Sequence, residues 1–348
     1  MRFREAYKDI ELYEPGRIPI DTDLSDNTNL FGLSPSTGDA FAKLSSDTIS
    51  RYPSVFAKNL KEAIAEEHGV SVENVTTGCG SDDVIDSAMR AFCEPGDVIA
   101  YPWPTFGVVS TFARMNAARP VAVPALRNFA IDVDELIAKG ASVTYVCSPN
   151  NPTGTAITRD ELGRLENELD GILLLDEAYA DFGEADYAQF AAQSIRTVSM
   201  RTMSKVCGLA GLRVGYAIGP TKIIHEIEKS RGPYKVGGVA ETVACRVLST
   251  DRAWRRDVVE KTRMNRTRLA DELTRRKLAH YPSAGNFILV SLPDGHNAVE
   301  TNNALRQLDV TTRPLTALPF AGECLRVTVG PWEMMEKFLN ALDNVLSR

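Results

Sequence analysis

Short apolar segments alternate with helical segments through the middle of this chain, and this alternation restricts the fold more than any other feature. The apolar segments read as buried strands at 98–101, 143–147, 172–175, 196–200 and 214–218. Helical periodicity separates most of them, at 82–93, 105–117, 159–168 and 222–230. Strands that are apolar throughout and alternate with helices are typical of a mainly parallel sheet covered on both faces. We therefore predict an α/β fold built on such a sheet.

The two ends of the chain have a different texture. Residues 1–36 are irregular, with several prolines and a polar cluster, which predicts an arm that packs on the rest. The later part reads as a smaller α+β domain with a charged helix, two strands and a terminal helix, at 252–278, 287–290, 324–329 and 332–346. A chain of 348 residues has room for one large and one small domain. The predicted division is an arm over 1–40, a large domain over 41–245 and a small domain over 246–348.

Charge and composition argue against several classes of function. The formal net charge is −7 and no basic block is present, which argues against nucleic-acid binding. The six cysteines form no C-x-x-C pair and the four histidines lie far apart, so we expect reduced thiols and no metal site. The N-terminal residues lack a secretory signal, and no apolar run is long enough to span a membrane. We predict a cytoplasmic protein with neither membrane nor nucleic acid as partner.

The segment Thr202-Met203-Ser204-Lys205, followed by Arg213, is the strongest indication of chemistry. A lysine amine forms an imine with an aldehyde, and the hydroxyls and the guanidinium can bind a phosphate. Pyridoxal 5′-phosphate (PLP) carries both an aldehyde and a phosphate, and its chemistry starts from a lysine Schiff base. This segment therefore indicates a PLP enzyme.

Glycines before the predicted helix 82–93 indicate a second phosphate contact. In the segment 78–83 we expect Ser81 or Asp82 to be the N-cap of that helix, and Gly80 lets backbone amides approach a ligand. A helix N-terminus attracts anions through its amides and its dipole. Taken alone, this segment also fits an ordinary glycine turn.

Further candidates lie where ligands bind open α/β sheets, near the carboxyl ends of strands. Asp176 can pair with a protonated pyridine nitrogen, and Tyr179 can hydrogen-bond the phenolic oxygen of the ring. Asn151 lies in a turn after the strand 143–147, and Phe106 can stack on an aromatic face. Each also has a simpler reading: a helix cap for Asp176, a turn residue for Asn151 and a core residue for Phe106.

Two arginines near the C-terminus are candidates for binding an acid group. Arg326 lies between two apolar residues in the predicted strand 324–329, where a guanidinium is costly to bury without an anionic partner. It forms either a structural ion pair or a bidentate contact with a substrate carboxylate or phosphate. Arg313 is a second candidate, for which a surface role is also open.

The order of these motifs resembles that of a known family. They run Gly-x-Gly-Ser-Asp, Pro-Thr-Phe, Asn-Asn-Pro-Thr-Gly, Asp-Glu-Ala-Tyr, Ser-Lys, Gly-Leu-Arg-Val-Gly and Leu-Arg-Val-Thr-Val-Gly. Over nearly its whole length the chain resembles the PLP-dependent aminotransferases of fold type I, the aspartate aminotransferase superfamily. Segments 27–32, 51–53 and 324–330 are similar to the histidinol-phosphate aminotransferases and their aromatic-aminotransferase relatives.

The resemblance implies a role for each candidate. Lys205 would form the imine with PLP and later move a proton between the substrate α-carbon and the cofactor. Asp176 would pair with the pyridine nitrogen, and Asn151 and Tyr179 would bond the phenolic oxygen while Phe106 stacks on the ring. The residues implied around the phosphate are Gly80, Ser81, Asp82, Thr202, Ser204 and Arg213. Tyr52 would reach the cofactor phosphate of a neighbouring subunit, which requires a homodimer.

The resemblance also implies the substrates. Arg326 would hold the acidic group of the substrate, and Arg313 and Asn29 lie where the substrate is recognised, together with Asn151. The implied reaction moves an amino group by a ping-pong route from histidinol phosphate to a 2-oxo acid such as 2-oxoglutarate, as in histidine biosynthesis. Thr28 replaces a common glutamate at the place of substrate recognition. Aromatic amino acids stay open as donors, because an arginine at position 326 serves a carboxylate or a phosphate alike. A PLP decarboxylase of phosphorylated amino acids is another alternative, and a non-enzymatic role predicts the loss of Lys205 or Asp176.

Overall fold

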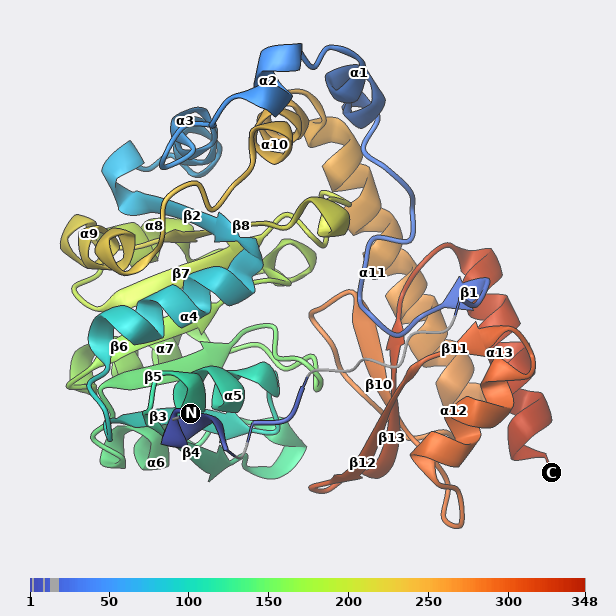
Figure 1. Cartoon of the computed structure of the whole chain (residues 1–348). Coiled ribbons are helices and arrows are strands. Elements are labelled where there is room, and N and C mark those ends of the chain that lie inside the picture. The colour runs from blue at the N-terminus through green and yellow to red at the C-terminus, as the bar shows by residue number, and fades with distance from the viewer. Residues whose placement is uncertain (2, 9, 13–18, 348) are drawn as a thin grey trace.

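The structure contains a larger and a smaller sheet, and a long helix leads from the part around the larger sheet to the smaller one (Figure 1). It is a computed structural model that describes residues 1, 3–8, 10–12 and 19–347. The long helix is α11 (Arg252–Arg275). Parts of the predicted arm, residues 2, 9 and 13–18, lie outside the described residues, as does the last residue of the predicted small domain.

The larger sheet has seven strands in the order β2-β8-β7-β6-β5-β3-β4. Strand β8 runs antiparallel to both of its neighbours, and the other pairs are parallel, so the predicted α/β fold with a mainly parallel sheet is confirmed. The strands are β2 (Val75–Cys79), β3 (Val98–Trp103), β4 (Arg119–Pro124), β5 (Val143–Cys147), β6 (Ile172–Asp176), β7 (Thr197–Thr202) and β8 (Val214–Ile218).

Helices cover both faces of this sheet, as the apolar strands predicted. Successive side chains of a strand point to opposite faces, and in β6 Leu174 packs with α4, α5 and α9 while Leu173 and Leu175 pack with α6 and α7. The helices of this part are α1 (Ser36–Ala42), α2 (Ser46–Ser50), α3 (Lys58–His68), α4 (Gly80–Phe92), α5 (Val108–Met115), α6 (Val133–Ala138), α7 (Arg159–Glu168), α8 (Ala188–Gln193), α9 (Thr221–Ser230) and α10 (Gly238–Thr250).

The smaller sheet is antiparallel, in the order β12-β13-β10-β9. Its strands are β9 (His280–Tyr281), β10 (Phe287–Ser291), β12 (Arg313–Leu318) and β13 (Gly322–Thr328). Helices α12 (Ala298–Arg306) and α13 (Trp332–Leu346) pack on it around a core that includes Leu325 and Phe338. The predicted domain boundaries stay predictions, and α10 runs through the boundary drawn at 245.

Several elements differ from the prediction for local reasons. The helix predicted at 105–117 begins at Val108, because the hydroxyl of Thr105 donates to Asn150 Oδ1 over 2.7 Å and keeps this segment in a loop. Strands β2, β4 and β12 and helix α10 were not predicted. The three strands contain glycine, proline, threonine or exposed positions that weaken an apolar strand signal.

The N-terminal arm joins the two parts. Its short strand β1 (Thr22–Asp23) pairs in parallel with β11 (Val310–Thr311) of the smaller part, and Leu24 is buried in that core. The chain then crosses toward the large sheet, where Asn29 Nδ2 donates to the carbonyl oxygen of Val206 over 2.9 Å. Residues 24–29 are therefore held from both sides.

Gly215 on β8 lies where the sheet packs closely against the start of α4. A Cβ on Gly215 would lie 2.1 Å from the carbonyl carbon of Gly80 and 2.2 Å from the amide nitrogen of Ser81. We predict that Gly215→Ala lowers the free energy of unfolding by at least about 2 kcal/mol, because two backbones must separate. Urea unfolding measures this. The matched control is Gly211→Ala, whose Cβ meets nothing within 4 Å, and equal stability of the two variants would contradict the prediction.

Candidate active site

The candidate residues of the large sheet meet at the carboxyl ends of β5, β6 and β7. Asp176 is the last residue of β6, Thr202 is the last residue of β7, and Asn151 follows the end of β5. Because these strands are adjacent and parallel, their ends lie at one edge of the sheet. Ligands of open α/β sheets bind at this edge.

The buried carboxylate of Asp176 accepts two hydrogen bonds. Its side chain accepts the phenol proton of Tyr145 over 2.6 Å at Oδ2 and the amide of Ala178 over 3.0 Å at Oδ1. Burial raises the pKa of Asp176 to about 6, and the two hydrogen bonds act in the opposite direction. An oriented carboxylate of this kind can pair with a protonated ring nitrogen.

Lys205 lies in the turn after β7, beside the ring of Tyr179. Its Nζ is 5.3 Å from the centre of that ring and donates to the carbonyl oxygen of Asp26 over 3.2 Å. Burial and, to a lesser extent, the nearby Arg326 lower the pKa of Lys205 to about 8, while carboxylates including Asp26 act against this shift. A larger fraction of this amine is therefore neutral, and nucleophilic, than for an ordinary lysine.

The predicted phosphate residues form one cluster at the start of α4. Arg213 donates to Ser204 Oγ over 3.4 Å and to Asp82 Oδ2 over 3.3 Å, and Thr202 donates to Ser204 over 2.9 Å. Gly80 adopts φ +80°, and a Cβ there would lie 2.4 Å from Arg213 Nη2. The predicted N-cap was wrong: Cys79 is the N-cap, so Ser81 and Asp82 lie in the first turn of α4.

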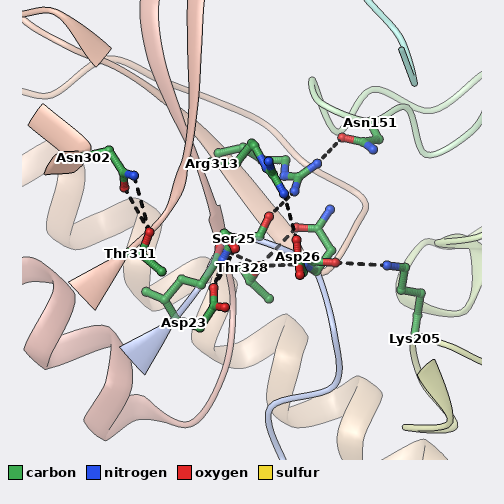
Figure 2. A network of polar contacts seen from close by, with 12 residues as sticks. Asp23, Ser25, Asp26, Asn151, Lys205, Asn302, Thr311, Arg313 and Thr328 are labelled. Atoms are coloured by element: carbon green, nitrogen blue, oxygen red, sulfur yellow. Dashed lines mark hydrogen bonds and ion pairs between the residues drawn. The ribbon is translucent and has the colours of Figure 1, made fainter. Parts of the chain in front are cut away.

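Arg313 lies next to Asp26 of the arm (Figure 2), and Arg326 contacts both the arm and Asn151. Arg326 donates to Asn151 Oδ1 over 2.5 Å and to the carbonyl oxygen of Ser25. Arg313 forms an ion pair with Asp26, whose Oδ1 lies 2.8 Å from Nη2. The surface role left open for Arg313 gives way to a partly buried position beside Arg326 on the paired strands β12 and β13.

Tyr179 is held in the site by a hydrogen bond, whereas Phe106 packs on the core of the large sheet. The hydroxyl of Tyr179 accepts from Asn27 Nδ2 over 3.1 Å, and burial raises the pKa of Tyr179 to about 12, so the phenol stays protonated at neutral pH. Phe106 is half-buried and packs against the core on the face of α4 and α5. Its stacking on a cofactor stays a prediction.

Neither Tyr52 nor Asn29 has a polar contact with these candidate residues. Tyr52 lies apart from them, and the side chain of Asn29 is hydrogen-bonded to the backbone. Tyr52 lies between α2 and α3 with 83% of its surface exposed, and its ring stacks on Tyr234 with centroids 4.9 Å apart. Asn29 Oδ1 accepts from the amide of Phe31 over 2.8 Å, while its Nδ2 donates to Val206. Both polar atoms of Asn29 thus anchor the arm beside Lys205, and its contact with substrate stays a prediction.

The residues present fit the predicted cofactor. The donor set at Gly80, Ser204 and Arg213 suits a phosphate, and the glycine at position 80 lets the Arg213 guanidinium approach the start of α4, where a Cβ would collide with it. Lys205 offers an amine of lowered pKa and Asp176 an oriented carboxylate. An amine, a carboxylate and a phosphate cradle on one sheet edge are the groups that hold PLP.

A match to a known protein family identifies the class of this protein. Residues 19–342 match the family described as aminotransferase class I and II. The chain belongs to this family. The predicted enzyme class, a PLP-dependent aminotransferase of fold type I, is therefore confirmed, as is the resemblance on which it was based.

Several relatives of this aminotransferase align with it over nearly their full length. A histidinol-phosphate aminotransferase 1 from Trichormus variabilis is 32% identical and aligns over 99% of both chains. A histidinol-phosphate aminotransferase from Ruegeria is 36% identical over 92% of this chain and 91% of its own. The crystal structure of histidinol-phosphate aminotransferase from Sinorhizobium meliloti, in complex with PLP, has a TM-score of 0.89 and 23% identity, with coverage of 99% and 98%.

The described residues of this aminotransferase include neither a membrane-spanning helix nor a group of side chains that could hold a metal ion. Within 19–347 and the short described stretches before them, no helix is long and apolar enough to cross a membrane. In the same part of the chain, no three histidine, cysteine or acidic side chains are grouped so as to hold a metal ion.

Sequence reasoning missed two side chains that contact the candidate site. Tyr145 sits in the middle of β5, and a phenol within a buried apolar strand requires a hydrogen-bond partner, which is the signal that points to it. Asp26 belongs to a polar cluster that was noted without a role. Only the crossing of the arm from β1 brings Asp26 to Arg313, which lies 287 residues further along the chain.

Removing the hydroxyl of Tyr145 tests whether its hydrogen bond lowers the pKa of Asp176. Asp176 must be ionised to pair with a protonated ring, so cofactor affinity falls as the pH drops through its pKa of about 6. Without the donated hydrogen bond that pKa rises, and we predict that Tyr145→Phe moves the acid limb of PLP affinity upward by about one pH unit. Fluorescence titration of PLP at several pH values measures this limb. Tyr101→Phe, in β3 of the same sheet, is the control, and an unmoved or lowered limb in Tyr145→Phe would contradict the assignment.

Proposed function

We propose that this aminotransferase transfers the amino group of histidinol phosphate to a 2-oxo acid such as 2-oxoglutarate by a ping-pong route. The names of full-length relatives at 32% and 36% identity support this choice of donor. The observation that carries the reaction type is the convergence of Lys205, Asp176 and the phosphate cradle on one edge of the sheet. Histidine biosynthesis is the corresponding metabolic role.

Lys205 is proposed as the group that binds the cofactor and moves the proton. Bound at this edge, PLP supplies an aldehyde for the amine and a ring that withdraws electrons from the substrate α-carbon. A lysine with a pKa of about 8 exchanges its proton readily near neutral pH, which suits an acid and base at that carbon. Its Nζ lies beside the ring of Tyr179, which is itself proposed to contact the cofactor.

Asp176 and Tyr179 are proposed to orient and polarise the ring. The carboxylate of Asp176 is fixed by Tyr145 and by the amide of Ala178, so it presents a constant direction to a ring nitrogen. Tyr179 keeps its proton at neutral pH and can donate it to a phenolic oxygen. Asn151 uses its carbonyl oxygen for Arg326, which directs its amide nitrogen, the donor end, away from that arginine.

Arg326 and Arg313 are proposed to bind the acid groups of both substrates in turn. They lie opposite one another on paired strands, with β13 carrying Arg326 and β12 carrying Arg313. In a ping-pong reaction the donor leaves before the acceptor binds, so one site serves a phosphate and a carboxylate. Guanidinium groups bind either anion in bidentate geometry.

A homodimer is part of this proposal. Tyr52 is largely exposed and lies among other exposed apolar side chains of the same region, Phe41, Ile49, Val55 and Phe56. Exposed apolar side chains that gather on one face fit a protein interface. The proposal places Tyr52 at the cofactor phosphate of the partner subunit, and a cytoplasmic location suits an enzyme of biosynthesis.

Half-reactions with single amines test the substrate. Histidinol phosphate, phenylalanine and tyrosine are each mixed with the PLP form, and the cofactor absorbance is followed without acceptor. We predict conversion to the pyridoxamine form with histidinol phosphate at a kcat/KM at least about tenfold above the aromatic amino acids. Preference for phenylalanine or tyrosine would select the aromatic alternative. Release of carbon dioxide from a phosphorylated amino acid without keto-acid product would select a decarboxylase.

The same assay tests the lysine. Lys205→Ala should lose turnover by several orders of magnitude, because both the covalent attachment and the proton transfer depend on this amine. Lys222→Ala at the exposed start of α9 is the control and should keep wild-type rates. A Lys205→Ala variant that retains full activity would overturn the mechanism.

A further inference from the structure

A carboxylate of the chain itself lies in the proposed acid-binding site. Asp26 Oδ1 accepts from Arg313 Nη2 over 2.8 Å, and the side chains of this pair are only 18% and 28% exposed, respectively. The neighbouring carbonyl oxygen of Ser25 accepts from Arg326 (Figure 2). One short stretch of the arm thus contacts both arginines that the proposed function assigns to the substrate.

This stretch is held in a defined conformation. Asp23 Oδ1 accepts from the amide and the hydroxyl of Ser25 over 2.9 and 2.6 Å. After Asp26, Asn27 adopts φ +52°, and its amide donates to Thr328 Oγ1 over 3.0 Å. With contacts on either side, Asp26 is a fixed part of the site.

The position of Asp26 changes the charge that a substrate meets. Arg313 and Arg326 contribute two positive charges, and Asp26 offsets one of them at close range. An entering acid group is therefore attracted by the guanidiniums and repelled by the carboxylate. The repulsion energy is proportional to the charge of the entering group, so it is twice as large for a phosphate dianion as for a carboxylate.

We propose that Asp26 is a specificity-determining residue that balances the affinities for doubly and singly charged acid groups. This inference rests on the proposed function, in which one site binds a phosphate-bearing donor and then a carboxylate-bearing acceptor. Without Asp26 the preference for the dianion over the monoanion would be larger, and the donor or its phosphate-bearing product would compete more strongly with the acceptor. With Asp26 the difference is smaller, because its charge weakens the binding of the dianion more than that of the monoanion.

Anion binding to the PLP-loaded enzyme tests this directly. Inorganic phosphate at pH 8 serves as the dianion and acetate as the monoanion, each titrated by isothermal calorimetry into wild type, Asp26→Asn and Asp26→Ala. We expect Asp26→Asn to bind phosphate about tenfold more tightly and acetate only about threefold, because doubling the charge squares the fold-change. The Ala variant should show the same order and covers the case in which the Asn variant does not fold.

Asp21→Asn is the matched control. It removes the same charge from an exposed position of the same arm, and both anion affinities should stay at wild-type values. If Asp26 only held Arg313 in place, its loss would weaken phosphate binding, and that result, or an unchanged affinity, would overturn the inference. The readout does not depend on which amine reacts. An inactive half-reaction with histidinol phosphate would thus remove the proposed donor and leave this test intact.

Discussion

The parallel alignment of β5, β6 and β7 is the constraint on which the candidate site depends. Because these strands end at one edge, Asn151, Asp176 and Thr202 are brought together although they are far apart in sequence. A buried ion pair fixes the ends of β6 and β7 relative to one another, since Arg201 Nη2 lies 2.9 Å from Glu177 Oε2. The strand ends at this edge are thus held together by the backbone hydrogen bonds of the sheet and by a buried ion pair.

Burial at this edge shifts the pKa values of Asp176 and Lys205 in opposite directions. It raises the pKa of Asp176 and lowers that of Lys205, because each loses the hydration of its charged form. Hydrogen bonds from Tyr145 and Ala178 offset part of the effect on Asp176, and Arg326 adds to the effect on Lys205. The outcome is a carboxylate that stays ionised at neutral pH near an amine that loses its proton easily. These two properties are the ones that a PLP site requires.

Much of this arrangement follows from local sequence. Apolar runs predicted five strands of the large sheet, and the glycine, lysine and arginine motifs predicted the phosphate cradle, because both depend on neighbouring residues. Strands β2 and β4 were missed since they lie at the sheet edges, where threonine, glycine and exposed positions replace the apolar run. Asp26 and Tyr145 act through partners that only the tertiary fold supplies. The N-cap of α4 was misplaced because Gly80, with its positive φ, begins the helix ahead of the polar residues expected to cap it.

The central claim is that Lys205 is a partly desolvated amine that takes the cofactor aldehyde. Cofactor-free protein can be mixed with PLP at a series of pH values and reduced with borohydride, and the modified lysine can be quantified by peptide mass spectrometry. The account predicts an adduct concentrated at Lys205, with a rate that reaches half its maximum near pH 8. Adducts at exposed lysines such as Lys222 and Lys337, or a Lys205 rate that rises only toward pH 10.5, the ordinary lysine pKa, would contradict it.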